Sequence, residues 1–564
     1  MNFMAPKLPN PVDLVGEMSF SDLNGMRVLF INMPLRENAM PNTPPQGPAL
    51  LAARLRMYGA EPTIIDLNSY RISDKRAVAE GKAEFGRHLD YDEAKSLISR
   101  HFDKHGEPHI VGLSGMITTL RWQEQICRQV RDLSSETFIV SGGGLATELK
   151  EGLFGWIDDL DSVAHSEGDD IMLVLTKTLK TASKHGRRGR DSNLRETPYY
   201  VGNVNGRQRY IFNGDRPKHL DELPFAAWDL LEEDVNGHRV LDGYIDVPVW
   251  GLGANNSSAT PFQMKRSLTT VSSRGCPYAC AFCYRGAQGE RNYGMRSAEN
   301  VAEEMQWLVD TYNVDFVGFP DDNFAVDKRR IALLPDVFAG MNIRWGTHTR
   351  LDEADDRLKP MSDSGCVYIG FGAESASPNT LGHMKKGGHI LRRGTQDLNG
   401  HEVPTTMIEG IRNCRDVGIH ANCTWIMGFP GEKLEDLKTS VTFIKWQQDL
   451  YTEGLTSGTP EYQNALNSVN SRMFTATAYP GTAMFRLPEV REKLDENFDI
   501  KFDKFSRPIC DDALKEYVLE LDDATKLLFG KDGEPLNFSA MSDAEFTRAR
   551  DYADNEEIEN ILGM

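Results

Sequence analysis

Three cysteines, Cys276, Cys280 and Cys283, stand close together in this 564-residue chain with the spacing C-x3-C-x2-C. Three thiolates at this spacing can bind three irons of one cubane 4Fe–4S cluster. No fourth cysteine follows nearby, so one iron would keep an open coordination position. Because clusters that only carry electrons normally have four cysteine ligands, the triplet predicts a cluster whose open iron binds a substrate or cosubstrate.

Two other uses of cysteine fit the chain less well. A zinc knuckle would need CxxC pairs and a fourth Cys or His at zinc spacing, and the nearest downstream candidates, His348 and Cys366, lie in other segments. Eight cysteines in 564 residues are sparse for a disulfide framework, and we see no secretory apolar region at the start. We expect most of the single cysteines to be small buried side chains; these are Cys127, Cys366, Cys414, Cys423 and Cys510.

Composition excludes several classes of partner. The net charge of −20 argues against nucleic acid, because phosphate binding needs a basic face. No uninterrupted apolar stretch of about 18 residues occurs, so we expect no membrane span. The length predicts two to four domains, and reduced thiols with an oxygen-sensitive cluster predict a cytoplasmic location.

The first part of the chain alternates strands with helices after a polar lead-in over residues 1–25, which predicts a parallel sheet. The predicted strands are 26–32, 61–66, 109–114, 137–140 and 162–165. Five such strands predict a flavodoxin-like, Rossmann-like domain that binds ligands at the carboxyl ends of its strands. The fourth strand leads into Gly142, Gly143 and Gly144, where the backbone can approach a large ligand closely. A tight turn that needs positive φ explains such glycines equally well.

The cysteine triplet, with Phe282 just before its third cysteine, resembles the radical S-adenosylmethionine (SAM) superfamily. In that superfamily the open iron chelates the amino and carboxylate groups of SAM. Residues 26–182, placed before such a triplet, resemble the cobalamin-binding domain of the cobalamin-dependent radical SAM enzymes. The resemblance implies cobalamin contacts from Pro45, Gly47, Ser114, Met116, Gly142, Gly143, Gly144, Glu167 and Gly168.

One segment departs from the wider cobalamin-domain pattern. Methyl-transfer and mutase domains carry Asp-x-His-x-x-Gly after the first strand, with the histidine as lower cobalt ligand. Here residues 32–37 read NMPLRE, and Pro34 cannot ligate cobalt. The resemblance therefore implies a base-off cobalamin without a histidine from this loop.

Residues 183–265 are predicted to connect the two domains. Within them, the run LPFAAWD at 223–229 resembles the connector of the same enzymes. A helix entry with buried Phe225 and Trp228 is a second reading, and both can hold together.

Residues 266–485 again alternate helices and strands. We expect a helix over 296–312 and strands at 314–319, 343–347, 367–372, 421–427 and 473–477. This order resembles the partial (β/α)6 barrel of radical SAM proteins, with ligand contacts at the carboxyl ends of the strands. The resemblance implies SAM-side contacts from Phe282, Asp321, Asp322, Asn323, Glu374, Ser375, Gly428 and Tyr479.

Two regions fall outside these motifs. The run 387–403 is either a substrate-side loop or an exposed insertion, and it carries two candidate acid–base groups, His389 and His401. Residues 486–564 are predicted to be mostly helical, most clearly over 511–528, and to cap the substrate site as the family's tail often does.

The resemblance implies a cobalamin-dependent radical SAM enzyme that moves a methyl group from SAM through methylcobalamin to an unactivated carbon of a small-molecule or natural-product substrate. It also implies an external electron donor such as flavodoxin or ferredoxin. The cofactors would carry the chemistry, so no catalytic side chain is assigned. A cyclase or rearrangement enzyme without net methylation shares these motifs, and a cluster-bearing electron-transfer protein is the third alternative.

Overall fold

The computed structural model describes residues 16–34, 44–69, 89–183, 186–246, 264–284, 293–521 and 527–564. These residues form two compact units. Unit 1 contains the described residues up to Tyr244 together with residues 510–521, and unit 2 contains the others.

Parts of the predicted segments lie outside the described residues. They are residues 1–15 of the lead-in, residues 35–43 (with the end of the loop that replaces the histidine motif) and 70–88 of the first predicted domain, residues 184–185 and 247–263 of the connector, residues 285–292 of the predicted barrel, and residues 522–526 of the helix expected over 511–528.

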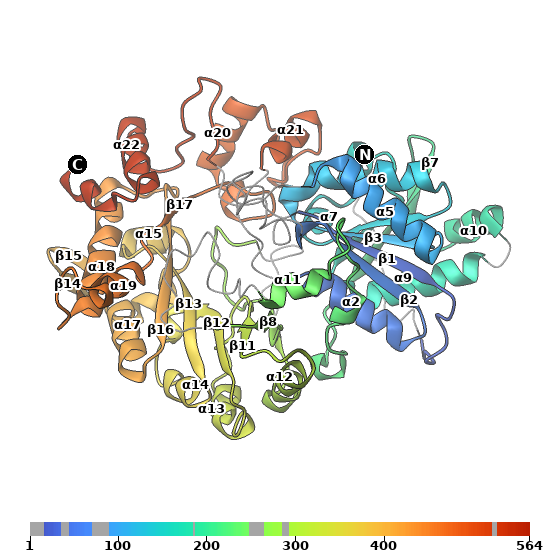
Figure 1. Ribbon diagram of the computed structural model, residues 1–564. Helices are drawn as coiled ribbons and strands as arrows, with labels where there is room; N and C mark the ends of the chain where they lie inside the picture. The colour runs from blue at the N-terminus through green and yellow to red at the C-terminus, as the bar shows by residue number, and fades with distance from the viewer. Residues whose placement is uncertain are drawn as a thin grey trace. The chain divides into compact units, whose positions relative to one another are not determined.

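Unit 1 is built on a seven-stranded sheet with the order β2-β1-β3-β4-β5-β7-β6 (Figure 1). Its strands are β1 (Arg27–Asn32), β2 (Glu61–Asp66), β3 (Ile110–Ser114), β4 (Phe138–Gly142), β5 (Ser162–Ser166), β6 (Tyr200–Val204) and β7 (Arg207–Gly214). The first five are parallel, in the flavodoxin order 2-1-3-4-5. The predicted flavodoxin-like fold is confirmed, and the buried run of β1 has the apolar character of a strand covered on both faces.

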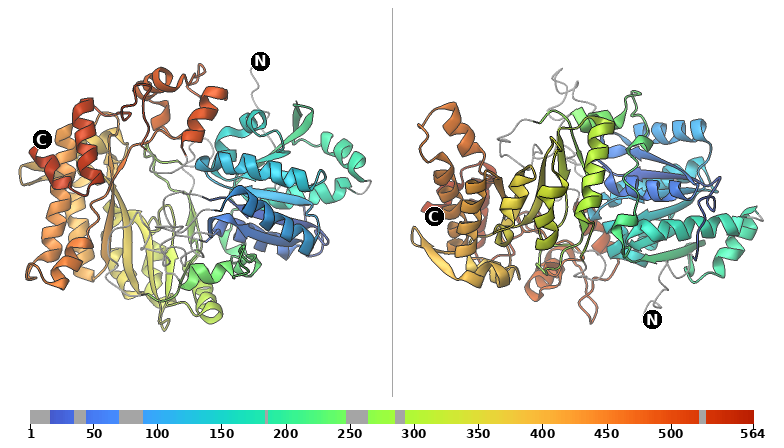
Figure 2. Two further views of the ribbon diagram at one scale, coloured as in Figure 1. Left: turned by 45° about the horizontal axis from the view of Figure 1, so that its top comes forward. Right: turned by 90° about the horizontal axis from the view of Figure 1, so that it is seen from below.

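Helices cover both faces of this sheet, since α2 packs against α9 and α5 packs against α6 (Figure 2). The helices of unit 1 are α2 (Gln46–Met57), α5 (Tyr91–His105), α6 (Leu120–Leu133), α7 (Gly144–Leu149), α8 (Leu153–Trp156), α9 (Gly168–Ala182), α10 (Gly186–Arg195), α11 (Val240–Asp246, which ends in unit 2) and α21 (Asp512–Glu520). A capping box between Asp90 and Glu93 starts α5. Gly106, with φ 79°, ends it.

The sheet continues past residue 182, where the first domain was predicted to end. β7 pairs in parallel with β5, and β6 pairs antiparallel with β7. The turn between them is Asn205-Gly206, with φ of 53° and 79°. Two central residues with positive φ are typical of a type I′ hairpin, which favours the pair Asn-Gly.

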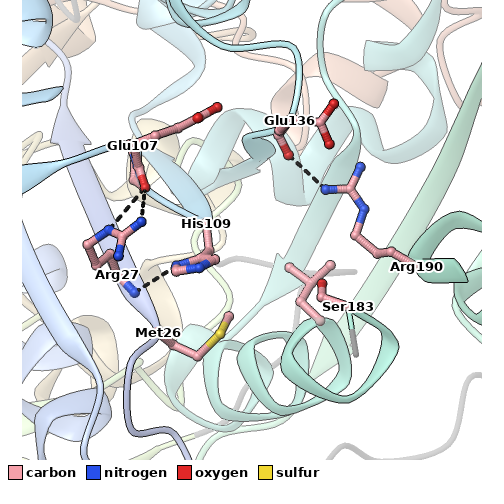
Figure 3. Close-up of a pocket in the computed structure, with 9 residues that line it drawn as sticks. Met26, Arg27, Glu107, His109, Glu136, Ser183 and Arg190 are labelled. Atoms are coloured by element: carbon pink, nitrogen blue, oxygen red, sulfur yellow. Dashed lines mark hydrogen bonds between the residues drawn. The ribbon is translucent and has the colours of Figure 1, made fainter. Parts of the chain in front are cut away.

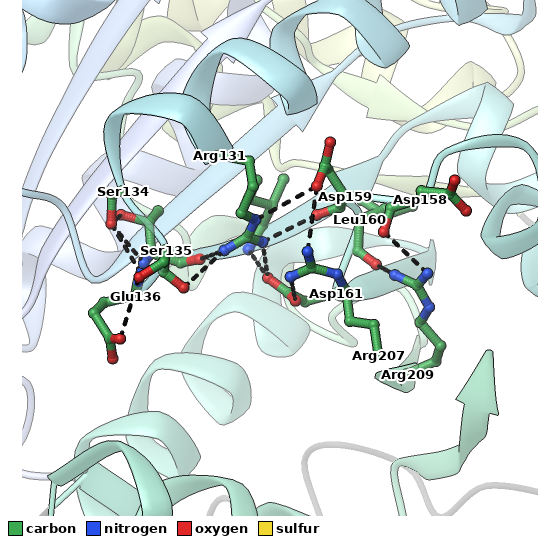
Figure 4. A network of polar contacts seen from close by, with 12 residues as sticks. Arg131, Ser134, Ser135, Glu136, Asp158, Asp159, Leu160, Asp161, Arg207 and Arg209 are labelled. Atoms are coloured by element: carbon green, nitrogen blue, oxygen red, sulfur yellow. Dashed lines mark hydrogen bonds and ion pairs between the residues drawn. The ribbon is translucent and has the colours of Figure 1, made fainter. Parts of the chain in front are cut away.

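A network of charged side chains stabilises the amino ends of the strands next to this hairpin (Figure 4). Arg131 donates to the carboxylate of Asp161 at 2.7 Å, and Arg207 donates to Asp159 at 3.2 Å. The fully buried Arg209 donates to the backbone carbonyls of Leu160 and, at 3.0 Å, Asp158. These bonds satisfy loop carbonyls that would otherwise be buried without a donor.

The predicted connector contains helices α10 and α11 and strands β6 and β7, and its run 223–229 belongs to unit 1. Trp228 is buried, as expected, and Phe225 is half-buried. The N–H of Ala227 donates to the carbonyl of Ala49 in α2 at 3.1 Å, so this segment packs against the first helix.

Unit 2 contains a six-stranded sheet with the order β17-β16-β13-β12-β11-β8, in which every pair is parallel. Its strands are β8 (Ser267–Thr269), β11 (Phe316–Phe319), β12 (Arg344–Arg350), β13 (Cys366–Glu374), β16 (His420–Met427) and β17 (Met473–Thr475). This sheet confirms the predicted partial (β/α)6 barrel.

The described helices of unit 2 mostly come between these strands in the chain, and the last two follow the final strand (Figure 1). They are α12 (Ala298–Tyr312), α13 (Lys328–Val337), α14 (Leu358–Asp363), α15 (Pro378–His383), α16 (Gly387–Ile390), α17 (Thr405–Val417), α18 (Leu434–Thr452), α19 (Pro460–Asn467), α20 (Pro488–Phe498) and α22 (Asp543–Asp554).

The run 387–403 has its own secondary structure. It forms α16 and then a hairpin of β14 (Thr395–Leu398) and β15 (His401–Pro404). His401 Nδ1 lies 3.1 Å from the hydroxyl of Thr439 on α18.

The C-terminal region is mostly helical, as predicted, but the helix expected over 511–528 ends at Glu520. The structure divides the region between the two units. In unit 1, α21 packs on α6, and Lys515 Nζ lies 3.4 Å from Glu124 and 3.3 Å from the carbonyl of Trp156. None of the helices in the described part of the chain has the length and apolar character needed to cross a bilayer.

Candidate functional site

The cysteine triplet of unit 2 lies on a loop that follows β9 (Ser273–Arg274). None of the three thiols is in a disulfide; Cys280 is buried, Cys276 is half-buried and Cys283 is exposed. Backbone bonds fix the loop between them, since the N–H of Ala281 donates to Met384 at 2.9 Å and its carbonyl accepts from Met484 at 2.7 Å. The loop is therefore tied to the segments that follow α15 and β17.

The predicted Asp321-Asp322-Asn323 run follows β11 and contacts the start of this loop. Asp321 accepts from the backbone N–H of Ser272 at 2.9 Å and from the hydroxyls of Ser272 and Ser273. Asp322 accepts from the N–H of Gly275 at 3.0 Å. Asp321 is buried whereas Asp322 is exposed, so of these two carboxylates only Asp322 is open to a ligand.

Asn323 is buried in a polar cluster at the ends of β11 and β12. Its amide donates to Glu353 at 3.3 Å, and the Thr349 hydroxyl lies 2.6 Å from both its carbonyl oxygen and the Glu353 carboxylate. Tyr278, from the cysteine loop, donates to the same Glu353 at 3.0 Å. Asn323 and Asp321 thus hold the loop in place, and a direct contact with SAM stays a prediction for both.

Arg350 at the end of β12 is a residue that the sequence did not single out. Its guanidinium lies 4.0 Å from the centre of the Tyr278 ring and 3.7 Å from Cys280 Sγ. Asp352 accepts from it at 2.9 Å, which fixes its orientation. A buried cation therefore stands beside one thiol of the triplet, where it would stabilise negative charge on sulfur.

Glu374 stands at the end of β13 with φ 65°, an uncommon conformation for a residue other than glycine. Its carboxylate binds Lys386 Nζ at 3.1 Å and accepts from the Thr424 hydroxyl at 3.3 Å. Lys386 also lies 5.7 Å from the centre of the Phe282 ring. This buried ion pair brings the ends of β13 and β16 close to the cysteine loop.

Ser375, the neighbour of Glu374, is completely buried. Its hydroxyl lies 3.2 Å from that of Ser440 on α18 and accepts from the N–H of Ser377 at 3.1 Å. The structure gives Ser375 a packing role, and its contact with SAM stays a prediction.

Gly428 follows β16 with φ 80°. A side chain at this position would come within 2.7 Å of the Phe546 ring on α22, so Phe546 occupies the space that the glycine leaves. Phe429 packs edge to face on Phe282, with ring centres 6.5 Å apart. Tyr479 is half-buried in the turn after β17, where its carbonyl accepts from the Thr482 hydroxyl at 2.8 Å.

Glu432, four residues after Gly428, is fully buried. One carboxylate oxygen accepts from the N–H of Gly428 at 2.6 Å, and the other has no hydrogen-bond partner. Burial raises the pKa of Glu432 from 4.5 to about 8, because the surroundings disfavour the charged form.

We expect Glu432→Gln to stabilise the protein at alkaline pH. The folded chain holds a proton between about pH 4.5 and pH 8 that the unfolded chain has lost. This proton therefore contributes to the free energy of unfolding in full below about pH 4.5. The contribution is lost as the pH rises through about 8, and the loss is on the order of a few kcal/mol. The variant should have a higher midpoint of thermal unfolding than the wild type above pH 8. Parallel midpoints of the two proteins across the pH range would contradict this, and exposed Glu435→Gln is the control.

The three thiols fit a metal cluster better than they fit free cysteines. Burial raises the pKa of Cys276. Bound metal ions would reverse this effect, because a coordinating thiol loses its proton outright. Three unbridged thiols on one anchored loop with Arg350 beside Cys280 are a chemically suitable donor set.

Unit 1 places the predicted cobalamin-side residues at the carboxyl edge of its sheet. Gly143, with φ 86°, follows β4, and a side chain there would come within 2.5 Å of the Gly115 carbonyl oxygen after β3. Ser114, at the end of β3, accepts from the N–H of Met33 at 3.0 Å. Met116 is 50% exposed, and so is an apolar side chain open to a ligand.

The remaining cobalamin-side residues border the same edge. Pro45 and Gly47 stand at the start of α2, and a side chain at Gly47 would meet nothing within 4 Å. Glu167 and Gly168 start α9, and a side chain at Gly168 would come within 3.2 Å of Leu51 on α2. This edge offers open backbone and an apolar side chain, which fits a large flat ligand; the individual contacts stay predictions.

A pocket of about 220 Å³ lies at the opposite, amino edge of the same sheet (Figure 3). Its polar side chains are already engaged: Arg27 donates to the carbonyl of Glu107 at 2.8 Å, and Arg190 donates to that of Glu136 at 2.7 Å. His109 accepts from the N–H of Arg27 at 3.0 Å. We assign this pocket no ligand.

The chain is similar to known proteins over most of its length. Residues 270–444 match the model of the radical SAM superfamily. The chain is 26% identical to an uncharacterised methyltransferase of Pyrococcus horikoshii over 80% of this chain and 86% of that protein. It is 24% identical to the cytidylyl-2-hydroxyethylphosphonate methyltransferase of Streptomyces wedmorensis over 72% of this chain and 73% of that one.

Two solved structures share the fold at 17% sequence identity. The cobalamin-dependent SAM radical enzyme OxsB, with aqua-cobalamin and SAM bound, matches with a TM-score of 0.60 over 89% of this chain and 66% of its own, just under two thirds of its length. The radical SAM methyltransferase TsrM from Kitasatospora setae, with cobalamin and a [4Fe-4S] cluster bound, matches with a TM-score of 0.53 over 83% and 75%. Residues 270–444 thus match the radical SAM superfamily, and the chain has the fold of these two solved structures.

Proposed function

We propose that this protein is a cobalamin-dependent radical SAM methyltransferase that methylates an unactivated carbon of a small molecule. The observation that carries the proposal is the combination of an anchored three-cysteine loop in one unit with an open, glycine-bordered sheet edge in the other. The similarity to two methyltransferases supports methyl transfer as the outcome.

Cys276, Cys280 and Cys283 would hold the cluster, and Asp322, Glu374 and Lys386 would be polar partners for SAM. The edge bordered by Gly47, Met116 and Gly142–Gly144 would hold cobalamin. When bound, these groups would supply reductive cleavage of SAM and a transferable methyl group. The cofactor-contacting roles of all these residues are part of the proposal.

The protein's own residues would hold and orient the reactants. Arg350 stabilises negative charge at the Cys280 sulfur, and Asp321 fixes the start of the loop through Ser272 and Ser273. Glu374 and Lys386 form a buried ion pair. A zwitterionic ligand that displaced one of these two side chains would bind the charge of the other.

The test begins with iron and cobalt content of protein made without oxygen and with cobalamin supplied. About four irons and one cobalt per chain are expected. Iron without cobalt would contradict the proposed role of unit 1. Incubation of the loaded protein with candidate substrates and with SAM that carries a trideuterated methyl group should then give a product in which a CD3 group has replaced one hydrogen of the substrate. A product of unchanged carbon count would instead indicate cyclisation or rearrangement.

The proposal includes an external one-electron donor such as flavodoxin or ferredoxin, since reductive cleavage of SAM consumes an electron, and a cytoplasmic location. Replacing a chemical reductant with reduced flavodoxin should sustain turnover. Failure of both flavodoxin and ferredoxin would contradict this part.

A further inference from the structure

A cluster of three metal-ligand side chains lies in unit 1, on an edge of the sheet that the proposed reaction does not use. It consists of His101 and His105 from the last turn of α5 and Glu232 from the segment after the 3-10 turn at Trp228–Leu230. One donor atom from each lies within 4.8 Å of the other two. Histidines four residues apart share one face of a helix, so α5 presents both to the carboxylate.

The local backbone holds this carboxylate in place. Leu231 forms a parallel bridge with Ile64 of β2, and the N–H of Glu232 donates to the Ile64 carbonyl at 2.8 Å. Because β2 is an edge strand of the sheet, the segment continues the ladder there and places Glu232 beside the end of α5.

An ordinary ion pair accounts for only part of the cluster. His105 Nε2 lies 2.8 Å from Glu232 Oε1, and Lys104 Nζ lies 3.2 Å from Oε2. His101 Nδ1 lies 3.8 Å from Oε1, which is too far for a hydrogen bond. This nitrogen is buried and has no partner, and the His101 side chain is only 4% exposed.

The other nitrogen of His101 completes a pattern found behind metal-bound histidines. His101 Nε2 lies 3.2 Å from the hydroxyl of Thr63 on β2. When Nε2–H donates to this hydroxyl, the lone pair of Nδ1 points to the cluster, and such a bond fixes the tautomer of a metal-ligating histidine.

The spacing of the donors suits a small divalent ion. Tetrahedral zinc, with bonds of about 2.1 Å to nitrogen and oxygen, places its ligands roughly 3.4 Å apart. The two measured donor separations to Glu232 Oε1, 2.8 and 3.8 Å, lie on either side of this value. The side chains of His105 and Glu232 are 33% and 17% exposed, so solvent can reach the site and supply a fourth ligand.

We propose that His101, His105 and Glu232 form a binding site for a divalent transition-metal ion such as zinc, which fastens the end of α5 to the segment on edge strand β2. Coordination releases any proton shared between His105 and Glu232 and forms bonds to His101 Nδ1, His105 Nε2 and Glu232 Oε1. The last turn of α5 favours a cation there, whereas Lys104 opposes it.

The test uses the full chain with its cluster already assembled, equilibrated with zinc chloride and then desalted. We expect about one zinc per chain in addition to about four irons. The iron content of each sample shows that the cysteines are occupied and do not bind the zinc. His105→Ala and Glu232→Gln should each lose the zinc while they keep the iron. His219→Ala, which removes an exposed histidine outside the cluster, should keep both.

Lys104→Gln separates a cation site from a structural ion pair. Removal of this half-exposed positive charge should tighten zinc binding by about two- to fivefold, as expected for a surface charge interaction. Zinc should also raise the midpoint of thermal unfolding of the wild type and not that of His105→Ala. Equal zinc content in the wild type and His105→Ala, or weaker binding by Lys104→Gln, would overturn the proposal.

Discussion

Cys280→Ala is expected to lose nearly all of the roughly four irons per chain and all cleavage of SAM. Each thiolate of the triplet would anchor one iron, and Cys280 is the buried one, beside the Arg350 guanidinium. Its loss leaves two thiols that cannot retain a cluster. Iron content and the formation of 5′-deoxyadenosine from SAM, both measured without oxygen, check this result.

The matched control for that variant is Cys510→Ala, which removes an exposed thiol of unit 1. It should keep both the iron and the SAM cleavage. If Cys280→Ala still produces 5′-deoxyadenosine, the assignment of the cluster to this loop is wrong.

Gly143→Val is expected to abolish cobalamin binding and leave the iron content unchanged. The backbone at Gly143 has φ 86°, which costs a β-branched residue on the order of 1–2 kcal/mol or more, and its side chain would collide with the Gly115 carbonyl oxygen. The ends of β3 and β4 would then move apart where the corrinoid is proposed to lie. Cobalt and iron per chain are the measurement.

Two further variants separate loss of the ligand from loss of the fold. Gly206→Val carries a similar φ cost, at 79°, but has open space around it and lies at the amino edge of the sheet. It should keep its cobalt. Gly47→Trp is free of steric conflict within the protein and should fold normally while it blocks the ligand. Normal cobalt content in both Gly143→Val and Gly47→Trp would rule out this edge as the cobalamin site.

Local sequence patterns were sufficient to predict most of the parallel strands of both units. A run such as 28–31 is apolar at every position and is followed by a polar turn, so its place in a buried parallel sheet is readable from its neighbours alone. β8 was not predicted, because Ser267–Thr269 has only one strongly apolar residue. The β6–β7 hairpin was not predicted either, although the pair Asn205-Gly206 is a hairpin signal.

The candidate site was predictable where one motif supplies it and not where distant segments meet. The triplet and the glycines are short local patterns. Arg350 and Lys386 are ordinary charged residues in sequence, and only the folded chain brings them to Cys280 and Phe282. The bonds of Asp321 to the serines before the cysteines, which support the loop, could likewise be seen only in the folded chain, and its contact with SAM stays a prediction.

The division of the C-terminal region also bears on how the protein can be synthesised and dissected. Unit 1 receives α21, whose Lys515 contacts Glu124 on α6, only after the ribosome has completed nearly all of unit 2. Domains of a nascent chain generally fold in order from the N-terminus, but here the first unit must wait for a late segment. A fragment that stops before residue 510 would expose the part of α6 that α21 covers, so expression of the first unit alone calls for residues 510–521 to be joined to it or added as a separate peptide.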